Sequence, residues 1–211
     1  MTSPTLGLVR RRLVGMSGTD VIEVVDAITA AGSKCVLAGG WGVDALSGRR
    51  TRRHADLDLA VDDGSELPAA AAGAALVALG FGFVRSDRVD DAFFGHRELY
   101  EDRRGRLVDL HAAHIGPDTD RADPSGVRVL GAASVSTGTI DGRTVACLSV
   151  SAQLASHAGY DQRRVDRRDR RLLERLRHRD DGAPAPGAAR SGTVSSQGEG
   201  RGDAPPSVSV V

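Results

Sequence analysis

Residues 36–61, VLAGGWGVDALSGRRTRRHADLDLAV, predict a strand, a Gly-Gly turn, a short helix, a basic loop and a second strand. In the second strand Asp56 and Asp58 share one face, because successive strand residues point to opposite sides of a sheet. They are about 6.6 Å apart along the strand, at ~3.3 Å rise per residue. Two carboxylates this close repel each other, and each raises the pKa of the other unless a cation lies between them. The stretch therefore indicates a strand that holds a cation.

The same stretch favours a magnesium ion together with a phosphate group. Mg²⁺ prefers oxygen ligands, and proteins typically hold it with one or two carboxylates plus substrate phosphates. Gly39 and Gly40 begin the short helix, and the exposed N–H groups of a helix N-terminus suit a phosphate. A phosphate cradle and two metal carboxylates thus fall in one segment, and this combination suggests nucleotidyl transfer.

The basic loop between the two strands is a candidate for binding the phosphates. It holds four arginines and His54, and arginine matches phosphate oxygens bidentately. Its position beside the carboxylates favours a functional role for one or two of these residues over a merely solvated loop, and we select Arg52 and His54. Trp41 follows the glycines, and two roles stay equally open for it: stacking near a nucleotide, or packing the helix onto the sheet.

Two carboxylates further along the chain are candidates for the catalytic base. Residues 107–111, LVDLH, predict a strand on which Leu107, Asp109 and His111 share one face. If this strand neighbours the first pair, Asp109 can bind metal or accept the proton of the attacking hydroxyl. Glu98, on the predicted strand 96–100, competes with Asp109 for the role of base.

Composition excludes several other classes of protein. The chain has 211 residues, with 28 basic and 28 acidic side chains and a formal net charge of zero. A neutral chain argues against general nucleic-acid binding, which usually needs a basic face. No apolar run approaches the ~20 residues that span a membrane, and the N-terminal residues do not predict a secretion signal. We therefore expect a cytoplasmic protein whose two cysteines are free thiols.

The chain divides into four predicted parts. Residues 1–17 form a flexible leader without periodicity, and residues 18–150 form the core. Residues 151–180 form a C-terminal helical segment with an apolar stripe. Residues 181–211 are rich in Ala, Pro, Gly and Ser, which predicts a disordered tail.

Within the core, local signals predict particular turns and helix ends. Asp20 and Glu23 resemble a capping box that begins the first helix. Asp141-Gly142 between apolar runs predicts a type I′ hairpin turn. Residues 86–95 and 116–126 are predicted to be polar loops.

Two motifs in the opening stretch resemble those of the polymerase-β-like nucleotidyltransferases, and within them the lincosamide and aminoglycoside nucleotidyltransferases. These motifs are GGWGVD at residues 39–44 and HADLD at residues 54–58. Asp109-Leu110-His111 resembles the acidic strand motif of that family, with alanine next where proline is usual. Residues 146–161, ACLSVSAQLASHAGYD, resemble a longer downstream run. The resemblance extends over about residues 21–176.

The resemblance implies an α+β fold, in which a mixed β-sheet is flanked by helices and a small C-terminal helical part closes over the substrate. It implies that Asp56 and Asp58 are Mg²⁺ ligands and that Asp109 is the third ligand or the base. It also implies that Gly39 and Gly40 hold the triphosphate.

Some positions depart from the family pattern. Ser151 stands where the run has glutamate, Ser156 stands where it has phenylalanine, and the histidine expected near Arg168 is missing. The loop 86–95 lacks the tryptophan often found there. Because the chemistry motifs are intact while substrate-side positions differ, nucleotidyl transfer is better supported than any particular antibiotic.

We therefore expect a metal-dependent nucleotidyltransferase that moves AMP from ATP to a hydroxyl of a small lincosamide or aminoglycoside antibiotic. One alternative keeps the chemistry and changes the acceptor to a protein or an RNA end. Another is a catalytically silent nucleotide-binding module of the same fold. The neutral charge weighs against RNA, and the intact Asp56, Asp58 and Asp109 argue against a silent module.

Overall fold

A computed structural model describes residues 15–62, 70–88, 96–117, 121–122, 128–157 and 163–182. The predicted tail lies outside these residues from residue 183 onward, and so does the predicted leader up to residue 14. Up to residue 181 the described residues belong to one compact unit. Among the described residues no helix is both long and apolar enough to cross a membrane.

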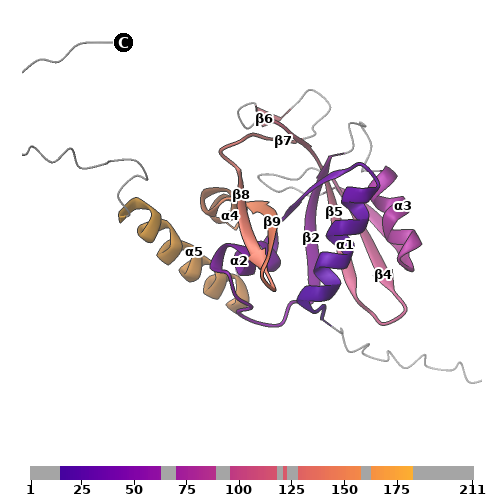
Figure 1. Cartoon of the computed structure of the whole chain (residues 1–211), viewed down its shortest axis with the longest axis horizontal. Helices are drawn as coiled ribbons and strands as arrows, with labels where there is room; N and C mark the ends of the chain where they lie inside the picture. The colour runs from indigo at the N-terminus through magenta and orange to yellow at the C-terminus, as the bar shows by residue number, and fades with distance from the viewer. Residues whose placement is uncertain are drawn as a thin grey trace, which may run out of the picture. The chain divides into compact units, whose positions relative to one another are not determined.

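The described residues contain five helices and nine strands (Figure 1). The helices are α1 (Gly18–Ala30), α2 (Gly39–Ser47), α3 (Ala70–Ala78), α4 (Val150–Ser156) and α5 (Arg164–Gly182). The first five strands are β1 (Lys34–Leu37), β2 (Asp56–Asp62), β3 (Phe81–Arg88), β4 (His96–Asp102) and β5 (Leu107–Ile115). The others are β6 (Arg121–Ala122), β7 (Arg128–Leu130), β8 (Val135–Ile140) and β9 (Arg143–Leu148).

Seven strands follow one another in the order β3-β4-β5-β2-β1-β9-β8, and β7 joins β5 with β6 beside it. The sheet is mixed: β2 runs parallel to β5, and β1 runs parallel to β9. The pairs β1–β2, β3–β4, β4–β5 and β8–β9 are antiparallel. This is the mixed sheet with flanking helices that the sequence predicts.

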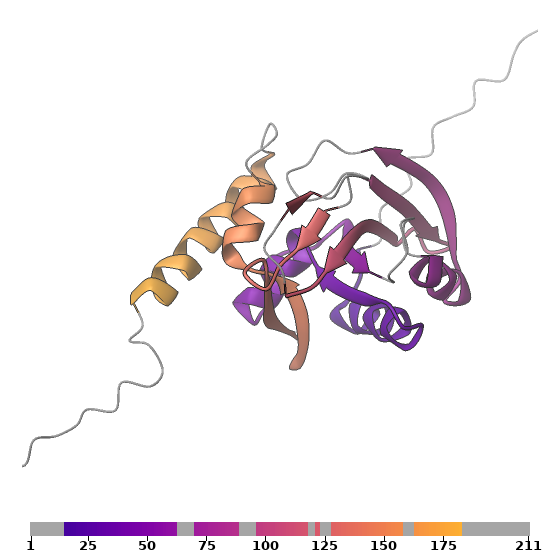
Figure 2. The same cartoon turned by 90° about the horizontal axis from the view of Figure 1, so that it is seen from above.

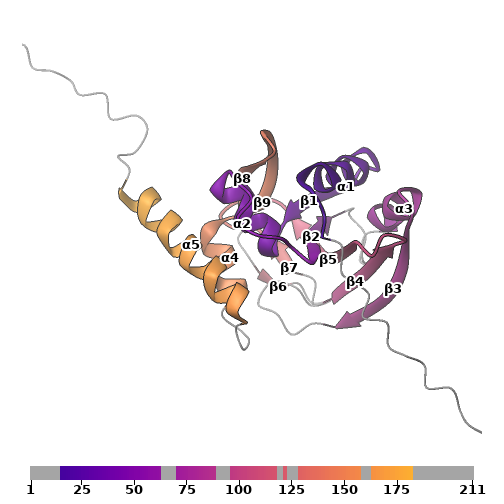
Figure 3. The ribbon, with the colours of Figure 1, turned by 90° about the horizontal axis from the view of Figure 1, so that it is seen from below.

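The two faces of the sheet carry different side chains. On one face α1 and α3 lie side by side (Figures 2 and 3). They bury the larger apolar residues of the central strands, among them Leu57, Leu59, Val108 and Leu110, all 0 % exposed. The other face carries a smaller cluster of mostly small residues, to which Ala60 of β2 belongs. Asp56 and Asp58 belong to this second face because they alternate with Leu57 and Leu59.

Local predictions of a turn and of the cysteines are confirmed. Asp141 and Gly142 have φ of 47° and 81°, as a type I′ turn between β8 and β9 requires. Cys35 and Cys147 are free thiols.

Other local predictions need correction. The capping box that begins α1 is formed by Ser17 and Asp20, one turn earlier than the predicted pair Asp20 and Glu23. Strand β3 continues to Arg88, so the first three residues of the predicted loop 86–95 are strand, and the rest of that loop lies outside the described residues. The predicted loop 116–126 contains β6, which pairs with β7.

Candidate functional site

Three carboxylates meet on the face of the central strands that lies opposite α1 and α3. Asp58 of β2 and Asp109 of β5 are direct partners in the parallel ladder, so their side chains leave the same face. Asp56 lies two residues earlier on β2. One oxygen atom from each carboxylate lies within 4.8 Å of the other two. The structure thus brings together the three residues that the sequence predicts as metal ligands.

Burial and mutual repulsion raise the pKa of two of these carboxyls. The pKa of Asp56 rises to about 6, first because burial disfavours its charged form and then because Asp58 and Asp109 repel it. The pKa of Asp109 is raised by burial and then by the charge of Asp58. A divalent cation among these oxygens would remove the repulsion, and Mg²⁺ prefers oxygen donors. The cluster therefore fits Mg²⁺ by its donor atoms and by its charge.

The N-terminus of α2 lies directly beside this cluster. Gly39 has φ of 53°, and a side chain there would collide with the Asp58 carboxylate, so only glycine permits so close an approach. Ala38 precedes the helix and gives it no side-chain cap, whereas Ser17 caps α1 and Ser149 caps α4. The first N–H groups of α2 therefore lack a side-chain acceptor, and the positive end of the helix dipole favours an anion there.

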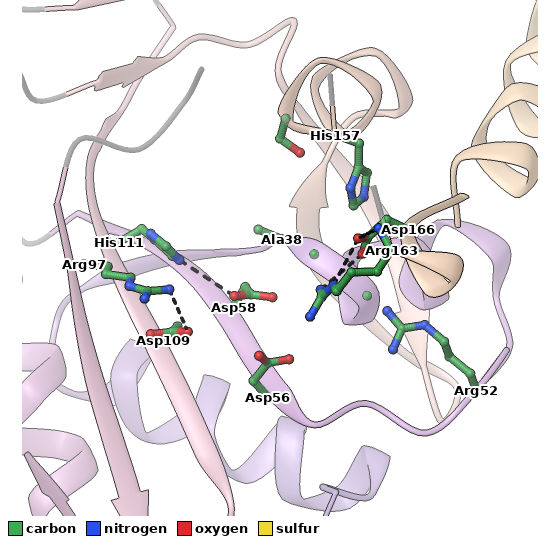
Figure 4. A pocket seen from close by; sticks show the side chains of 13 residues that line it. Ala38, Arg52, Asp56, Asp58, Arg97, Asp109, His111, His157, Arg163 and Asp166 are labelled. Carbon is green, nitrogen blue, oxygen red and sulfur yellow. Dashed lines mark hydrogen bonds and ion pairs between the residues drawn. The ribbon is translucent and has the colours of Figure 1, made fainter. Parts of the chain in front are cut away.

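The carboxylates and the start of α2 line a cavity of about 270 Å³. Figure 4 shows it from close by, with the strands on one side and residues near the start of α5 on the other. Besides residues 38–40 and the three carboxylates, the lining consists of Arg52, Arg97, His111, Ser156, His157, Arg163 and Asp166. The cavity is therefore polar and mixed in charge, with three arginines facing the carboxylates.

Two of these arginines are each held by an aspartate at the start of α5. The guanidinium of Arg52 donates to both oxygens of Asp169, with Nη2 2.6 Å from Oδ2. Arg163 pairs with Asp166, with Nε 3.1 Å from Oδ2. Burial raises the pKa of Asp166, but the hydrogen bonds from Arg163 outweigh this effect and lower the pKa. The predicted phosphate contact at Arg52 is thus fixed in place at the cavity wall.

The third arginine was not predicted from the sequence. Arg97 lies on β4 opposite His111 of β5, and its Nη1 atom lies 3.7 Å from Oδ2 of Asp109. His111 Nε2 lies 3.8 Å from Oδ1 of Asp58. The signal that could have revealed Arg97 is the strand alternation, because Arg97 and Leu99 share a face with Asp109 once β4 is paired with β5.

His54, predicted as a phosphate contact, and Trp41 do not line the cavity. For Trp41 this favours packing of the helix onto the sheet, one of the two roles that the sequence left open. His54 is 2 % exposed, and its Nε2 atom lies 2.5 Å from Oδ2 of the fully buried Asp44. Trp41 is 2 % exposed in the main core, with its ring centroid 4.8 Å from that of His54. Asp44 also accepts hydrogen bonds from the backbone and hydroxyl of Thr51. These buried groups pack under the basic loop and fix its position. Of the residues that we selected in this loop, Arg52 lines the cavity.

Glu98 lies on the wrong face of the sheet to act as the base. In the antiparallel ladder it stands opposite Leu110, a core residue of β5, and not opposite Asp109. Its carboxylate accepts a hydrogen bond of 2.9 Å from the hydroxyl of Tyr100, which is mostly buried on that face. The prediction that Glu98 shares a cleft with Asp109 is therefore wrong, because pairing with β5 points the two side chains to opposite faces.

Two further lining residues, Ser156 and His157, come from the end of α4. Both lie in the run 146–161 that resembles a family motif, so the sequence carried a signal for them. Arg163 and Asp166 belong to the predicted C-terminal helical segment, in a stretch that contains many arginines. Only the fold, which places the start of α5 across from β2, distinguishes these two from the rest.

Comparison with known proteins points to one enzyme family. The family model for aminoglycoside-2''-adenylyltransferase matches residues 20–173 of this chain, which is more than half of it. A curated relative, a lincosamide resistance protein from Staphylococcus haemolyticus, is 29 % identical over 144 residues, covering 66 % of this chain and 83 % of the relative.

Solved structures show the same fold. The lincomycin-bound crystal structure of the lincosamide antibiotic adenylyltransferase LnuA matches with a TM-score of 0.62 and 23 % identity, over 77 % of this chain and 99 % of that one. ANT(2'')-Ia in complex with adenylyl-2''-tobramycin matches with a TM-score of 0.54 and 24 % identity, over 79 % of this chain and 98 % of that one. At these identities the two structures establish the shared fold.

Proposed function

Because this chain belongs to the aminoglycoside-2''-adenylyltransferase family and is a nucleotidyltransferase, we propose that it transfers AMP from ATP to a hydroxyl group of a small antibiotic. The acceptor class we propose is a lincosamide or an aminoglycoside. The matching relatives are named for resistance to lincosamides or were solved with lincomycin or an adenylylated tobramycin bound. The donor, the metal dependence and the acceptor class are all parts of this proposal.

One observation carries the proposal: three carboxylates meet beside a helix N-terminus that has no side-chain cap. The three carboxylate oxygens lie within 4.8 Å of one another, and Gly39 of α2 packs directly against Asp58. Transfer of a nucleotidyl group needs a cation and a phosphate in contact. This geometry supports a cation site directly beside a phosphate site. Carboxylates alone would equally suit a metal site without a nucleotide.

Asp56 and Asp58 are the residues we propose to hold Mg²⁺, because both face the cavity from one strand. A bound Mg²⁺ would polarise the phosphate and stabilise the leaving pyrophosphate. Asp109, on the neighbouring strand, is either the third ligand or the group that takes the proton of the acceptor hydroxyl. With Glu98 on the far face, Asp109 has no competitor for that role among the residues predicted from the sequence.

The phosphate side of the site is formed by the start of α2 and by Arg52. The N–H groups at the start of α2 suit the phosphate oxygens of ATP, and Gly40 lies where a side chain would collide with Arg52 and His54. Arg52 keeps 18 % of its side chain exposed although Asp169 holds it. The guanidinium is therefore pre-positioned, which reduces the entropy lost when it contacts a phosphate.

The acceptor oxygen forms a bond to the α-phosphorus, and the bond from that phosphorus to pyrophosphate breaks. The hydroxyl proton passes to Asp109, directly or through a neighbouring water, and the displaced pyrophosphate keeps the bonding electron pair. The raised pKa of Asp109 suits a proton acceptor better than an ordinary exposed aspartate, because proton transfer improves as the pKa approaches the working pH.

The test is pyrophosphate release from ATP with Mg²⁺, measured with a panel of lincosamides and aminoglycosides. We expect release to depend on one class of compound. In Asp56→Asn and Asp58→Asn we expect it to fall on the order of 10³-fold, because the cation would lose a charged ligand. Asp62→Asn is the matched control, since Asp62 lies on the same strand and outside the cavity.

Three outcomes would count against the proposal. Equal losses in the Asp62 control would point to a fault of the strand and not of the site. Unfolding of the Asp56 and Asp58 variants would make these carboxylates structural. Release with no compound, in a protein that binds ATP, would exclude the small antibiotics tested as acceptors.

A further inference from the structure

The residue run that resembles the family motif contains a fully buried polar side chain that does not line the cavity. Gln153 lies in the middle of α4 and is 0 % exposed. Helix α4 contacts α2 (Figure 3), and Nε2 of Gln153 donates a hydrogen bond of 3.3 Å to the carbonyl oxygen of Gly39. Gln153 therefore joins the C-terminal helices to the first residue of α2.

Close packing fixes this contact. A side chain at Gly42 would collide with Nε2 of Gln153, so the first turn of α2 is kept bare where the amide crosses it. The reverse orientation of the amide would place Oε1 against the Gly39 carbonyl, which is an acceptor facing an acceptor. The N–H side of the amide is therefore the side that faces Gly39.

Stability alone does not explain a glutamine here. Its Oε1 atom is buried, and no group among the described residues bonds to it. A buried acceptor without a partner destabilises the folded state, whereas an apolar side chain of the same shape at this position would not. Within the described part of the chain its one hydrogen bond goes to Gly39, the residue that also packs against the Asp58 carboxylate.

We propose that Gln153 is a positioning residue for nucleotidyl transfer. It holds the Gly39 carbonyl, so that the N–H groups at the start of α2 keep a fixed position relative to the three carboxylates. The phosphate cradle and the metal carboxylates are thereby aligned by a residue that touches neither phosphate nor metal. This inference rests on the proposed nucleotide site.

The test compares Gln153→Met with the wild type by calorimetric titration of a non-hydrolysable ATP analogue in Mg²⁺ buffer, alongside thermal unfolding of the free proteins. Methionine keeps the length and volume of glutamine and removes its hydrogen bond. We expect the Kd to rise roughly tenfold while Tm stays the same or increases. A merely structural role would do the opposite: Tm would fall, and the Kd of the folded protein would not change.

Two further variants sharpen the result. Leu154→Met introduces the same side chain at the next position of α4 and should leave the Kd within twofold of wild type. Gln153→Glu keeps the shape but sets a carboxylate oxygen toward the Gly39 carbonyl, so its Kd should rise more than that of Gln153→Met. Wild-type binding with an unchanged Kd in Gln153→Met would overturn this inference alone. Absence of binding by the wild type would overturn the proposed function and this inference with it.

Discussion

Two groups of aspartates in this molecule have opposite electrostatic environments. At the cavity, Asp56, Asp58 and Asp109 lie together, and the pKa values of the first and the last are raised. At the start of α1, Asp20 and Asp102 flank the guanidinium of Arg106, whose Nε atom lies 2.7 Å from Oδ2 of Asp102.

In the second group the local donors decide the pKa of each carboxyl. Burial raises the pKa of Asp20, but hydrogen bonds from Ser17 and the charge of Arg106 outweigh it and lower the pKa. Burial also raises the pKa of Asp102, and hydrogen bonds from Arg106 lower it again. At Asp20 and Asp102 the fold thus supplies a cation, Arg106, and backbone N–H donors that stabilise the charged carboxylates.

The contrast supports the proposal that the cluster at the cavity, and not the one at α1, is the functional one. Neighbouring carboxylates that repel one another reduce stability, whereas the cluster at α1 shows that this chain can supply a partner for buried acids. Carboxylates that repel one another without a protein cation to neutralise them are suited to bind a cation from solution. Groups with perturbed pKa values in a cleft often mark such functional sites. We therefore expect substitutions in the two groups to change stability in opposite directions.

The largest expected effect on stability is the loss of Arg106. This side chain is 9 % exposed, pairs with both Asp20 and Asp102, and lies over the ring of Phe81 at 5.2 Å. In Arg106→Met two carboxylates lose their shared cation, and we expect the free energy of unfolding to fall by about 3 kcal/mol. Urea denaturation followed by circular dichroism measures this change.

The matched control is Arg143→Met, which removes an arginine paired with Asp26 on the surface. Both of these side chains are at least half exposed, so water and salt screen the pair and no clear change in stability is expected. Equal losses in the two variants would show that the cluster at α1 is no more important than a surface pair.

A smaller effect of opposite sign is expected at the cavity. In metal-free protein at pH 7, Asp56→Asn should raise the free energy of unfolding by about 1 kcal/mol. The shift of the Asp56 pKa from 3.8 to about 6 would correspond to ~3 kcal/mol, and solvent screening of the partly exposed carboxyl reduces this figure. Denaturation in EDTA at several pH values measures the gain.

The pH dependence distinguishes this explanation from a general gain in packing. Between pH 3.8 and about 6 the folded protein binds the proton more tightly than the unfolded chain, so wild-type stability falls as the pH rises through this range. The advantage of Asp56→Asn should therefore be absent near pH 4 and complete above pH 6. Asp20 and Asp102 act in the other direction: their lowered pKa values stabilise the fold above pH 3.8, and this contribution is lost as the pH falls through the folded pKa. An advantage that is constant with pH would contradict the assignment.

The parts of the site that the sequence predicts are those set by local pattern. Alternation on one strand places Asp56 and Asp58 together and turns Leu57 into the core. The paired glycines predict the N-terminus of α2, and the structure adds that Gly39 packs against the Asp58 carboxylate. Asp109 follows from the same alternation, once its strand is assumed to neighbour β2.

The parts that the sequence does not predict depend on strand register and on distant contacts. Arg97 and Glu98 are adjacent in sequence, and only the pairing of β4 with β5 decides which of them faces Asp109. Tyr100 and Glu98 share a face by strand alternation, and the burial of the Tyr100 ring in the structure identifies that face as the core face. Arg163 and Asp166 meet the cavity because of how α5 lies in the fold, which no local pattern in an arginine-rich helix reveals.

The smallest expected effect concerns Glu98. Glutamine keeps an oxygen that can accept the hydrogen bond from Tyr100, so Glu98→Gln should retain stability, and its rate of pyrophosphate release should stay within about threefold of wild type. Asp109→Asn is the matched comparison, since it removes a carboxylate from the adjacent strand on the opposite face and should abolish most of the activity. Measured in one assay, the two variants test which face of the sheet does the chemistry. A large loss in Glu98→Gln with an unchanged Tm would restore Glu98 as the base, because a residue that acts only through the core would have to lose stability before it lost activity.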